Sequence, residues 1–550
     1  MIKYGEHQIF YFIGKGVFVL KLEYSSKKLI GLFFCVVLIC IMQVSAACTG
    51  IYVGKDASAD GSTIIARSND YRADWGNHIT VTPHVDNSPG RFMPVSADGE
   101  VKTEIPATTY KYTATPYMDS AGVVANRTDC DAAACTNEYG VSMTMSVSAH
   151  LNNESLKADP LVHQGLAEIT AADLVICQSK TAREAVNVLF ETVDKYGNAE
   201  SNIAIIADQD EVWYVELYGG HQYAAVKMPK DKVAVFGNEF SLEYLSDYED
   251  SITSPDLTKL AEKNGFAVKG KNGEINLFES YAGTKINNDT AHMRTWEGHR
   301  LLNPSEYSSD YKHDEMYPLS FTPDNKVSLE DVAHVLRDRY EGTQYSPDEA
   351  GKNDSRAIGS DETLSAHIIQ IFPNLPAEMS CVSWVSSGPP VYGVFVPVSN
   401  DCVNVSEAYG ANQPASDMGV FDAEHYPYHV FKGLCTRCMG PDHYKDYGRP
   451  VQAYWNQSQS NMFAAMGDVL SNAEKMDKDS RANYLTSCCN DMQTKAFNDG
   501  KLIFYKLISS QNGNNTSGQA MEVKLNASKY NEVPPVPEGS TGFFGFHFPW

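Results

Sequence analysis

Two kinds of apolar periodicity divide the first half of the chain into predicted strands and helices. Between residues 49 and 149, short apolar runs alternate with Gly, Asp, Asn and Ser, which is typical of strands joined by turns. Residues 171–196 have helical spacing instead, and the capping box from Thr181 to Glu184 predicts that a second helix begins within them. Further apolar runs between Asp, Gly and Pro turns predict an antiparallel meander, at residues 202–207, 212–217, 223–228 and 232–236.

Longer blocks of one element type follow in the second half. Ser328 and Asp331 form a capping box for a predicted helix that runs to about Tyr340. Core strands are expected at residues 368–372, 382–385 and 391–396, helices at 462–476 and 481–497, and a loosely held tail from 511 onward. Because strands and helices come in blocks and do not alternate as βαβ units, the pattern predicts an α+β fold.

The N-terminal segment has the order of a secretory signal peptide. Lys21, Lys27 and Lys28 precede an apolar stretch at residues 29–42, and small residues at 44–47 follow it. The stretch is about 14 residues long, shorter than the roughly 20 that span a membrane, although uncharged residues up to Gly54 could extend it. We therefore expect residues 1–47 to be a leader that is cleaved after Ala47. A retained membrane anchor is the alternative.

Composition and charge restrict the kinds of partner. The 550 residues are 43% hydrophobic and 21% charged, enough for a large packed core, and the formal net charge is −25. Such an acidic chain lacks the broad basic surface that nucleic acids or anionic membranes attract. We therefore expect no nucleic-acid partner.

Cysteine usage fits an oxidising compartment. Two of the 12 cysteines lie in the predicted leader and ten follow it. Cys130 with Cys135, and the 435–438 pair with the adjacent 488–489 pair, are plausible disulfide partners. Zinc binding by the last four is disfavoured, because two adjacent cysteines poorly replace a second C-x2-C ligand pair.

Motifs for metal and nucleotide chemistry are absent from the sequence. The glycines of residues 50–55 have the wrong spacing for a phosphate loop, and neither H-E-x-x-H nor G-x-S-x-G occurs. We interpret His292 and His299 as ordinary core or surface histidines. We therefore expect no metal and no cofactor.

Cleavage after Ala47 would make Cys48 the first residue of the mature chain. An N-terminal cysteine carries a nucleophilic thiol and an α-amino group, of unperturbed pKa about 7.7–8.0, that can accept the thiol proton. The charge of Arg67 would stabilise the thiolate, and Asp70 lies near enough in sequence to serve the same pocket. The pattern predicts an N-terminal nucleophile; an exported domain that happens to begin with Cys is the alternative.

Motifs around these residues resemble the cysteine dipeptidase family of the N-terminal nucleophile hydrolases. The resemblance begins with Cys48-Thr49, the Val-Gly-Lys-x-Ala-Ser-x-Asp-Gly-Ser segment and the Arg-x-x-Asp pair. It continues to about residue 500, through segments 137–141, 181–185, 212–216, 219–222, 236–240, 331–343, 356–359 and 383–384. It implies a four-layer αββα sandwich with added helices towards the C-terminus, a catalytic domain at residues 48–505 and a tail at 506–550.

The resemblance also implies a nucleophilic Cys, an Arg-x-x-Asp pair, an oxyanion-hole Asn after a core strand and a later Arg. The residues that match are Cys48, Arg67, Asp70, Asn238 and Arg294. Arg300 is the second choice for the later Arg, and no residue matches a second oxyanion donor. Asp70 has two candidate roles, binding the ammonium group of a peptide substrate or orienting the Cys48 amine.

The expected protein is a secreted or cell-surface dipeptidase that acts on small peptides and is not stably inserted in a membrane after processing. An amidase of the same fold, acting on acylated amino acids, bile salts or penicillins, is one alternative. A secreted or lipid-anchored binding protein, with Cys48 as the lipid attachment point, is an alternative of another class. A homo-oligomer is compatible with the sequence.

Overall fold

A computed structural model of the chain describes residues 48–71, 75–122, 132–270, 272–282, 289–351 and 356–511, and the strands at 10–13 and 16–19. Contacts divide the chain into two compact units, Met1–Ser45 and Ala46–Trp550. In the first unit, β1 (Phe10–Ile13) and β2 (Gly16–Val19) form an antiparallel hairpin. The apolar stretch of the predicted leader lies outside the described residues. All elements below belong to the second unit.

Two large sheets contain most of the described strands. The six-stranded sheet has the order β14 (Val233–Phe236), β3 (Thr49–Val53), β4 (Thr63–Asp70), β16 (Thr363–Ile371), β17 (Cys381–Ser387) and β18 (Val396–Ser399). The eight-stranded sheet has the order β15 (Ser251–Thr253), β13 (Gln222–Lys227), β12 (Val212–Tyr218), β11 (Asn202–Ala207), β10 (Ser142–Ser148), β9 (Ala132–Asn137), β8 (Tyr112–Pro116) and β5 (Thr80–Thr82). A separate pair is formed by β6 (Phe92–Pro94) and β7 (Lys102–Glu104). Neighbouring strands are antiparallel throughout both sheets.

Helices occur in blocks between the strands. They are α2 (Asn153–Ala158), α3 (Glu168–Ile176), α4 (Ala182–Tyr196), α5 (Leu257–Asn264), α6 (Asp289–Leu302), α7 (Leu329–Arg337), α8 (Glu407–Gly410), α9 (Pro427–Cys438), α10 (Pro441–His443), α11 (Arg449–Ala473) and α12 (Lys478–Ser509). Short 3-10 or π turns occupy Asp119–Ala121, Leu245–Asp247, Phe278–Ala282, Ala377–Met379, Pro390–Tyr392, Ala415–Asp417 and Tyr444–Gly448. Over the described residues, every helix is too short or too polar to cross a membrane. The antiparallel sheets and blocks of helices agree with the predicted α+β class.

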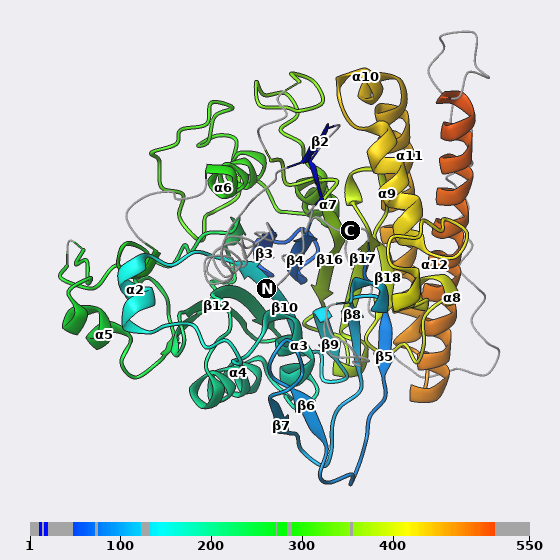
Figure 1. The fold of residues 1–550 in the computed structure, drawn as a ribbon. Coiled ribbons are helices and arrows are strands. Elements are labelled where there is room, and N and C mark those ends of the chain that lie inside the picture. The colour runs from blue at the N-terminus through cyan, green and yellow to red at the C-terminus, as the bar shows by residue number, and fades with distance from the viewer. Residues whose placement is uncertain are drawn as a thin grey trace, which may run out of the picture. The chain divides into compact units, whose positions relative to one another are not determined.

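Successive residues of a strand point to opposite sides of its sheet, and every residue of β4 and of β11 is buried, so both faces of each large sheet are covered at these strands. Ile65 of β4 and Ile205 of β11 belong to one apolar cluster that contains residues of both sheets. Ile206 belongs to a second cluster, which α3 and α4 share with the eight-stranded sheet. Ile64 belongs to a third, which α7, α9, α11 and α12 share with the six-stranded sheet. Figure 1 shows α12 beside β18 and α3 beside β10, in agreement with their contacts.

Both predicted helix starts are confirmed. The Thr181 side chain accepts the backbone N–H of Glu184 and caps α4, and Ser328 forms a full capping box with Asp331 at α7. The helix after Ser328 ends at Arg337, earlier than predicted, whereas α11 and α12 are longer than predicted and α12 continues past residue 505.

Two strand predictions need correction. The last strand of the predicted meander, β14, leaves the eight-stranded sheet and pairs with β3 of the other sheet. The turn before it is bonded to the chain after β3, since Gly54 donates its N–H to Lys232 O and Asp56 to Lys230 O. The strand predicted at residues 391–396 is a 3-10 turn from Pro390, and β18 starts only at Val396. A proline at a helical first position favours such a turn.

The cysteines do not pair as the sequence suggested. The thiols of the 435–438 and 488–489 pairs are free and buried. Cys489 of α12 is instead hydrogen-bonded to the thiol of Cys402, and neither forms a disulfide. Both thiols also hydrogen-bond the backbone of Ser399. Cys130 lies outside the described residues, so its predicted pairing stays a prediction.

Gly298 allows α6 to approach β14 closely. A Cβ atom at this position would lie 2.1 Å from Val235 Cγ1 and 2.3 Å from Val235 Cβ. We predict that Gly298→Ala lowers the free energy of unfolding by about 1–3 kcal/mol, because the helix must shift to admit the methyl group. Gly500→Ala in α12 is the control, since its nearest neighbour would be a movable side-chain atom of Val430 at 3.2 Å. Equal thermal midpoints for the two variants would contradict the close packing.

Candidate active site

Cys48 is fully buried at the start of β3, in the cluster that contains residues of both sheets. The next residue, Thr49, pairs with Ser68 of β4, and Thr49 N–H donates to Ser68 Oγ at 3.1 Å. Arg67, also on β4, places Nη2 3.3 Å from Cys48 Sγ. The structure therefore brings together the predicted nucleophile and the predicted cation that would stabilise its thiolate.

The guanidinium of Arg67 is held from the other sheet. Its Nη1 donates to Ala133 O at 3.2 Å and to Met145 O at 2.6 Å, and its Nη2 donates to Asn69 Oδ1 at 3.0 Å. Sequence reasoning missed Asn69. Because Asn69 lies two positions from Arg67 on one strand, period-two alternation puts both side chains on the same face and could have identified it.

Arg294 of α6 joins the start of β3 to the segment after β14. Its Nη1 donates to Cys48 O, and to Thr49 Oγ1 at 3.0 Å, and its Nη2 donates to Asn238 Oδ1 at 2.8 Å. Since Arg294 can only donate, these bonds also fix the Asn238 amide, whose Nδ2 donates to Ser148 O at 2.7 Å. An amide nitrogen has two hydrogens, so one remains for an oxyanion.

Other residues from the sequence analysis have different partners. Arg300, the second choice for the later arginine, forms a two-point ion pair with Glu297 at 2.5 and 2.7 Å. His292 bonds Glu239 Oε1 at 3.1 Å, and His299 bonds two backbone carbonyls, as core histidines do. In the described part of the chain, no group of His, Cys, Asp and Glu side chains could hold a metal ion.

Asp70 is fully buried, with its oxygens already engaged by the protein. Thr363 Oγ1 donates to its Oδ1 at 2.7 Å, Ser68 Oγ donates to its Oδ2 at 3.1 Å, and Arg356 Nη2 lies 3.7 Å from Oδ2. Burial raises the pKa of Asp70, and the charge of Arg356 opposes that rise. Both oxygens are thus engaged, and Ser68 links Asp70 to the backbone N–H of Thr49, which favours an orienting role over binding of a substrate ammonium group.

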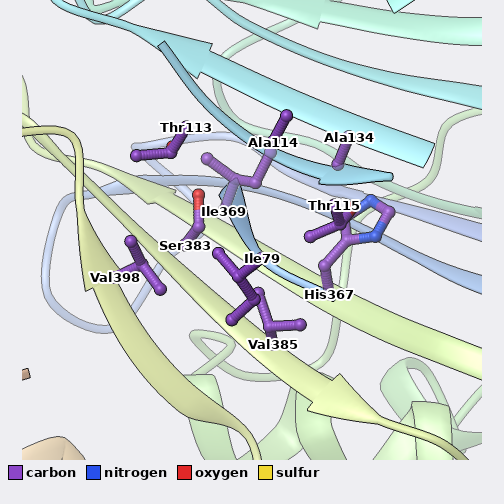
Figure 2. A pocket seen from close by; sticks show the side chains of 10 residues that line it. All are labelled: Ile79, Thr113, Ala114, Thr115, Ala134, His367, Ile369, Ser383, Val385 and Val398. Carbon is purple, nitrogen blue, oxygen red and sulfur yellow. The ribbon is translucent and has the colours of Figure 1, made fainter. Parts of the chain in front are cut away.

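His367 lies opposite Arg67 in the register of β16 and β4 and is also buried. Its Nε2 bonds Thr144 Oγ1 at 2.7 Å, and its Nδ1 has no hydrogen-bond partner in the described structure. Burial, and next the charge of Arg67, lower the pKa of His367 to about 3. Figure 2 shows its ring beside Thr115 in a mostly apolar pocket whose lining does not include Cys48.

Known proteins are similar to most of this chain. Peptidase family C69 matches residues 47–457. The probable dipeptidase B of Streptococcus pyogenes serotype M1 is 34% identical over 392 residues, which cover 68% of this chain and 76% of the relative. The probable dipeptidase of Latilactobacillus sakei is 32% identical over 373 residues, covering 66% and 76%. The probable dipeptidase of Salmonella dublin is 29% identical over 358 residues, covering 64% and 80%.

These similarities define a peptide hydrolase. The chain belongs to peptidase family C69, which confirms the family resemblance of its motifs. The matched region begins at residue 47, one position before Cys48.

The low pKa of His367 predicts acid sensitivity. The unfolded imidazole, of pKa about 6.5, takes up a proton below that pH, whereas the folded one stays neutral down to about pH 3. Stability is therefore lost as pH falls, by about 2 kcal/mol between pH 8 and pH 5 from this residue. His367→Gln should reduce the fall in thermal midpoint over this range, while Gln at the exposed His163 should not. Parallel pH profiles for parent and His367→Gln would contradict this.

Proposed function

We propose that the protein is a secreted dipeptidase whose nucleophile is Cys48, which becomes the N-terminal residue when the leader is removed. The observation that carries the proposal is the convergence of two buried arginines on this one residue. Arg67 contacts its sulfur and Arg294 contacts its carbonyl oxygen while holding Asn238. The names of the similar proteins support dipeptides as the substrate class.

In the proposed reaction, the α-amine takes the thiol proton and the thiolate attacks the carbonyl carbon of the peptide bond. Asn238 Nδ2 donates to the resulting oxyanion, and Arg294 keeps this amide oriented. The α-ammonium returns its proton to the departing amine as the C–N bond breaks. Water, activated by the same amine, then releases the acyl group from sulfur. Asp70 orients the groups beside the chain start.

The proposal includes the finer architecture and the compartment. We assign residues 1–47 to the leader, 48–505 to a catalytic domain of the four-layer αββα type and 506–550 to a tail. The cluster shared by the two sheets and the helix clusters outside them support the layering. The mature enzyme acts outside the cytoplasm, secreted or at the cell surface, on small peptides and without a cofactor. The signal-peptide order of residues 29–47 supports export.

Cys48→Ser tests the nucleophile. The hydroxyl is far harder to ionise than the thiol, so dipeptide hydrolysis should fall by at least about a hundredfold, with little change in thermal midpoint. Cys381→Ser is the matched control, because Cys381 is equally buried in the same cluster and should keep its activity. Parental rates from Cys48→Ser would overturn the mechanism. Cleavage of acylated amino acids but not of dipeptides would favour an amidase.

Blocking the removal of the leader tests the proposed base. While residue 48 is linked to Ala47 by a peptide bond, its nitrogen is an amide and cannot serve as the base. A precursor with residues 46 and 47 replaced to block cleavage should therefore be folded but inactive towards dipeptides. Mass spectrometry of the N-terminus and a hydrolysis assay on the same sample provide the measurement. An uncleaved precursor as active as the mature enzyme would exclude the α-amine as base.

A further inference from the structure

Arg356 is a partly exposed cation beside the proposed catalytic residues. Its side chain is 21% exposed, and its Nη2 lies 3.7 Å from Asp70 Oδ2 and 3.2 Å from Glu362 Oε2. Neither its Nε nor its Nη2 makes a hydrogen bond to any described residue, although both atoms are buried. A guanidinium has five N–H donors in a planar fork, so Arg356 retains donors for a further acceptor.

The fixed charges around residue 48 favour an anionic ligand. Arg67 and Arg294 are 3% and 0% exposed, and Arg356 is the third cation of this group. Burial lowers the pKa of Arg294, the like charge of Arg356 lowers it further, and the negative charge of Asp70 opposes this shift. Asp70 offsets part of their repulsion, and a further negative group beside Arg356 and Arg294 would offset more of it, since such attraction is strong at low dielectric.

The position of Arg356 is held by a strained residue. Tyr340 is fully buried and has a φ of 58°, in the left-handed region that bulky side chains rarely adopt. Its hydroxyl donates to Arg356 O at 2.8 Å, and its ring stacks at 6.2 Å on Trp296 of α6. Strain of this kind persists where the surrounding structure over-determines it, often at ligand sites.

The strand register places Asp70 beside the start of β3, and Arg356 lies next to Asp70. Thr49 pairs with Ser68 in an antiparallel register, so Asp70 lies opposite the position just before Cys48. In the proposed reaction the Cys48 amine protonates the leaving amine, which therefore lies beside the chain start. The leaving group of a dipeptide is a single amino acid whose carboxylate is only two bonds from that amine.

We propose that Arg356 binds the C-terminal carboxylate of the dipeptide through its unused N–H groups. This rests on the proposed function and adds a reason for its substrate length. A second residue after the scissile bond would place an amide where the carboxylate is bound, and the charge-assisted pairing would be lost. Arg356 is then a specificity-determining residue, with Asp70 and Tyr340 as its positioning residues.

The test compares a free dipeptide with the same dipeptide carrying a C-terminal amide. For the parent enzyme, kcat/KM should be roughly 10–100-fold higher for the free acid, the range expected for a charged hydrogen bond. Arg356→Ala should lose this factor on the free acid, chiefly through KM, so that the acid-to-amide ratio falls to about one, whatever both substrates lose through the altered surroundings of Asp70. Arg356→Lys should give an intermediate ratio, because it keeps the charge but not the fork.

Arg183→Ala is the matched control. Arg183 also pairs with two carboxylates, Glu211 at 3.1 Å and Asp250 at 2.9 Å, but it lies on α4 and contacts none of the proposed catalytic residues. Its loss should leave the acid-to-amide ratio unchanged. A parent enzyme that cleaves acid and amide equally, or an Arg356→Ala variant that loses the same factor on both, would overturn the inference and leave the dipeptidase proposal intact.

A parent enzyme that cleaves neither substrate would instead overturn the proposed function. Should Arg356→Ala fail to fold, product inhibition of the parent enzyme gives the answer. The free amino acid should inhibit at least about tenfold more strongly than its amide, because only the free acid carries the carboxylate. Equal inhibition by the two would also overturn the inference.

Discussion

A guanidinium group without access to water must find its hydrogen-bond acceptors inside the protein, and the site depends on how Arg294 does so. Its acceptors are Thr290 O of α6 itself and, outside the helix, Cys48 O, Thr49 Oγ1 and Asn238 Oδ1, which belong to the start of β3 and to the segment after β14. One side chain of α6 thus fixes an amide relative to residue 48. Losing any acceptor would leave a buried N–H of a charged group without a hydrogen bond, which is more costly than losing the same contact at the surface.

The two buried arginines contact different atoms of residue 48. Arg67 reaches the sulfur from between the sheets, where backbone carbonyls of β9 and β10 hold it. Arg294 reaches the carbonyl of the same residue from α6. The site therefore requires both sheets and α6 to be in place at once, and β14 connects them because it follows strands of one sheet and pairs in the other.

Structure that depends on neighbouring residues was predicted correctly from the sequence, whereas most contacts between distant segments were not. Thr181 and Ser328 were identified as caps because capping depends on residues three apart. The sheet to which β14 belongs depends on its contact with β3, far away in the sequence, and the turn residues alone do not determine it. The contact of Arg67 with Cys48 agrees with the sequence prediction, whereas Arg356 and Thr363 reach Asp70 from a distant segment that no spacing rule connects to it.

The pairing of β3 on both sides has a consequence for the proposed N-terminus at Cys48. Gly50 lies between Arg67 of β4 and Phe236 of β14, so the strand that follows Cys48 is an interior one. Chain termini normally fray, opening many times before the rest of the molecule unfolds. A terminus that continues directly into an interior strand exchanges its amide hydrogens only in the rarer, larger openings. Such a terminus is also a poor substrate for an aminopeptidase, which needs a flexible N-terminus. A reactive group at the very end of a polypeptide can in this way be as firmly positioned as one in the middle of it.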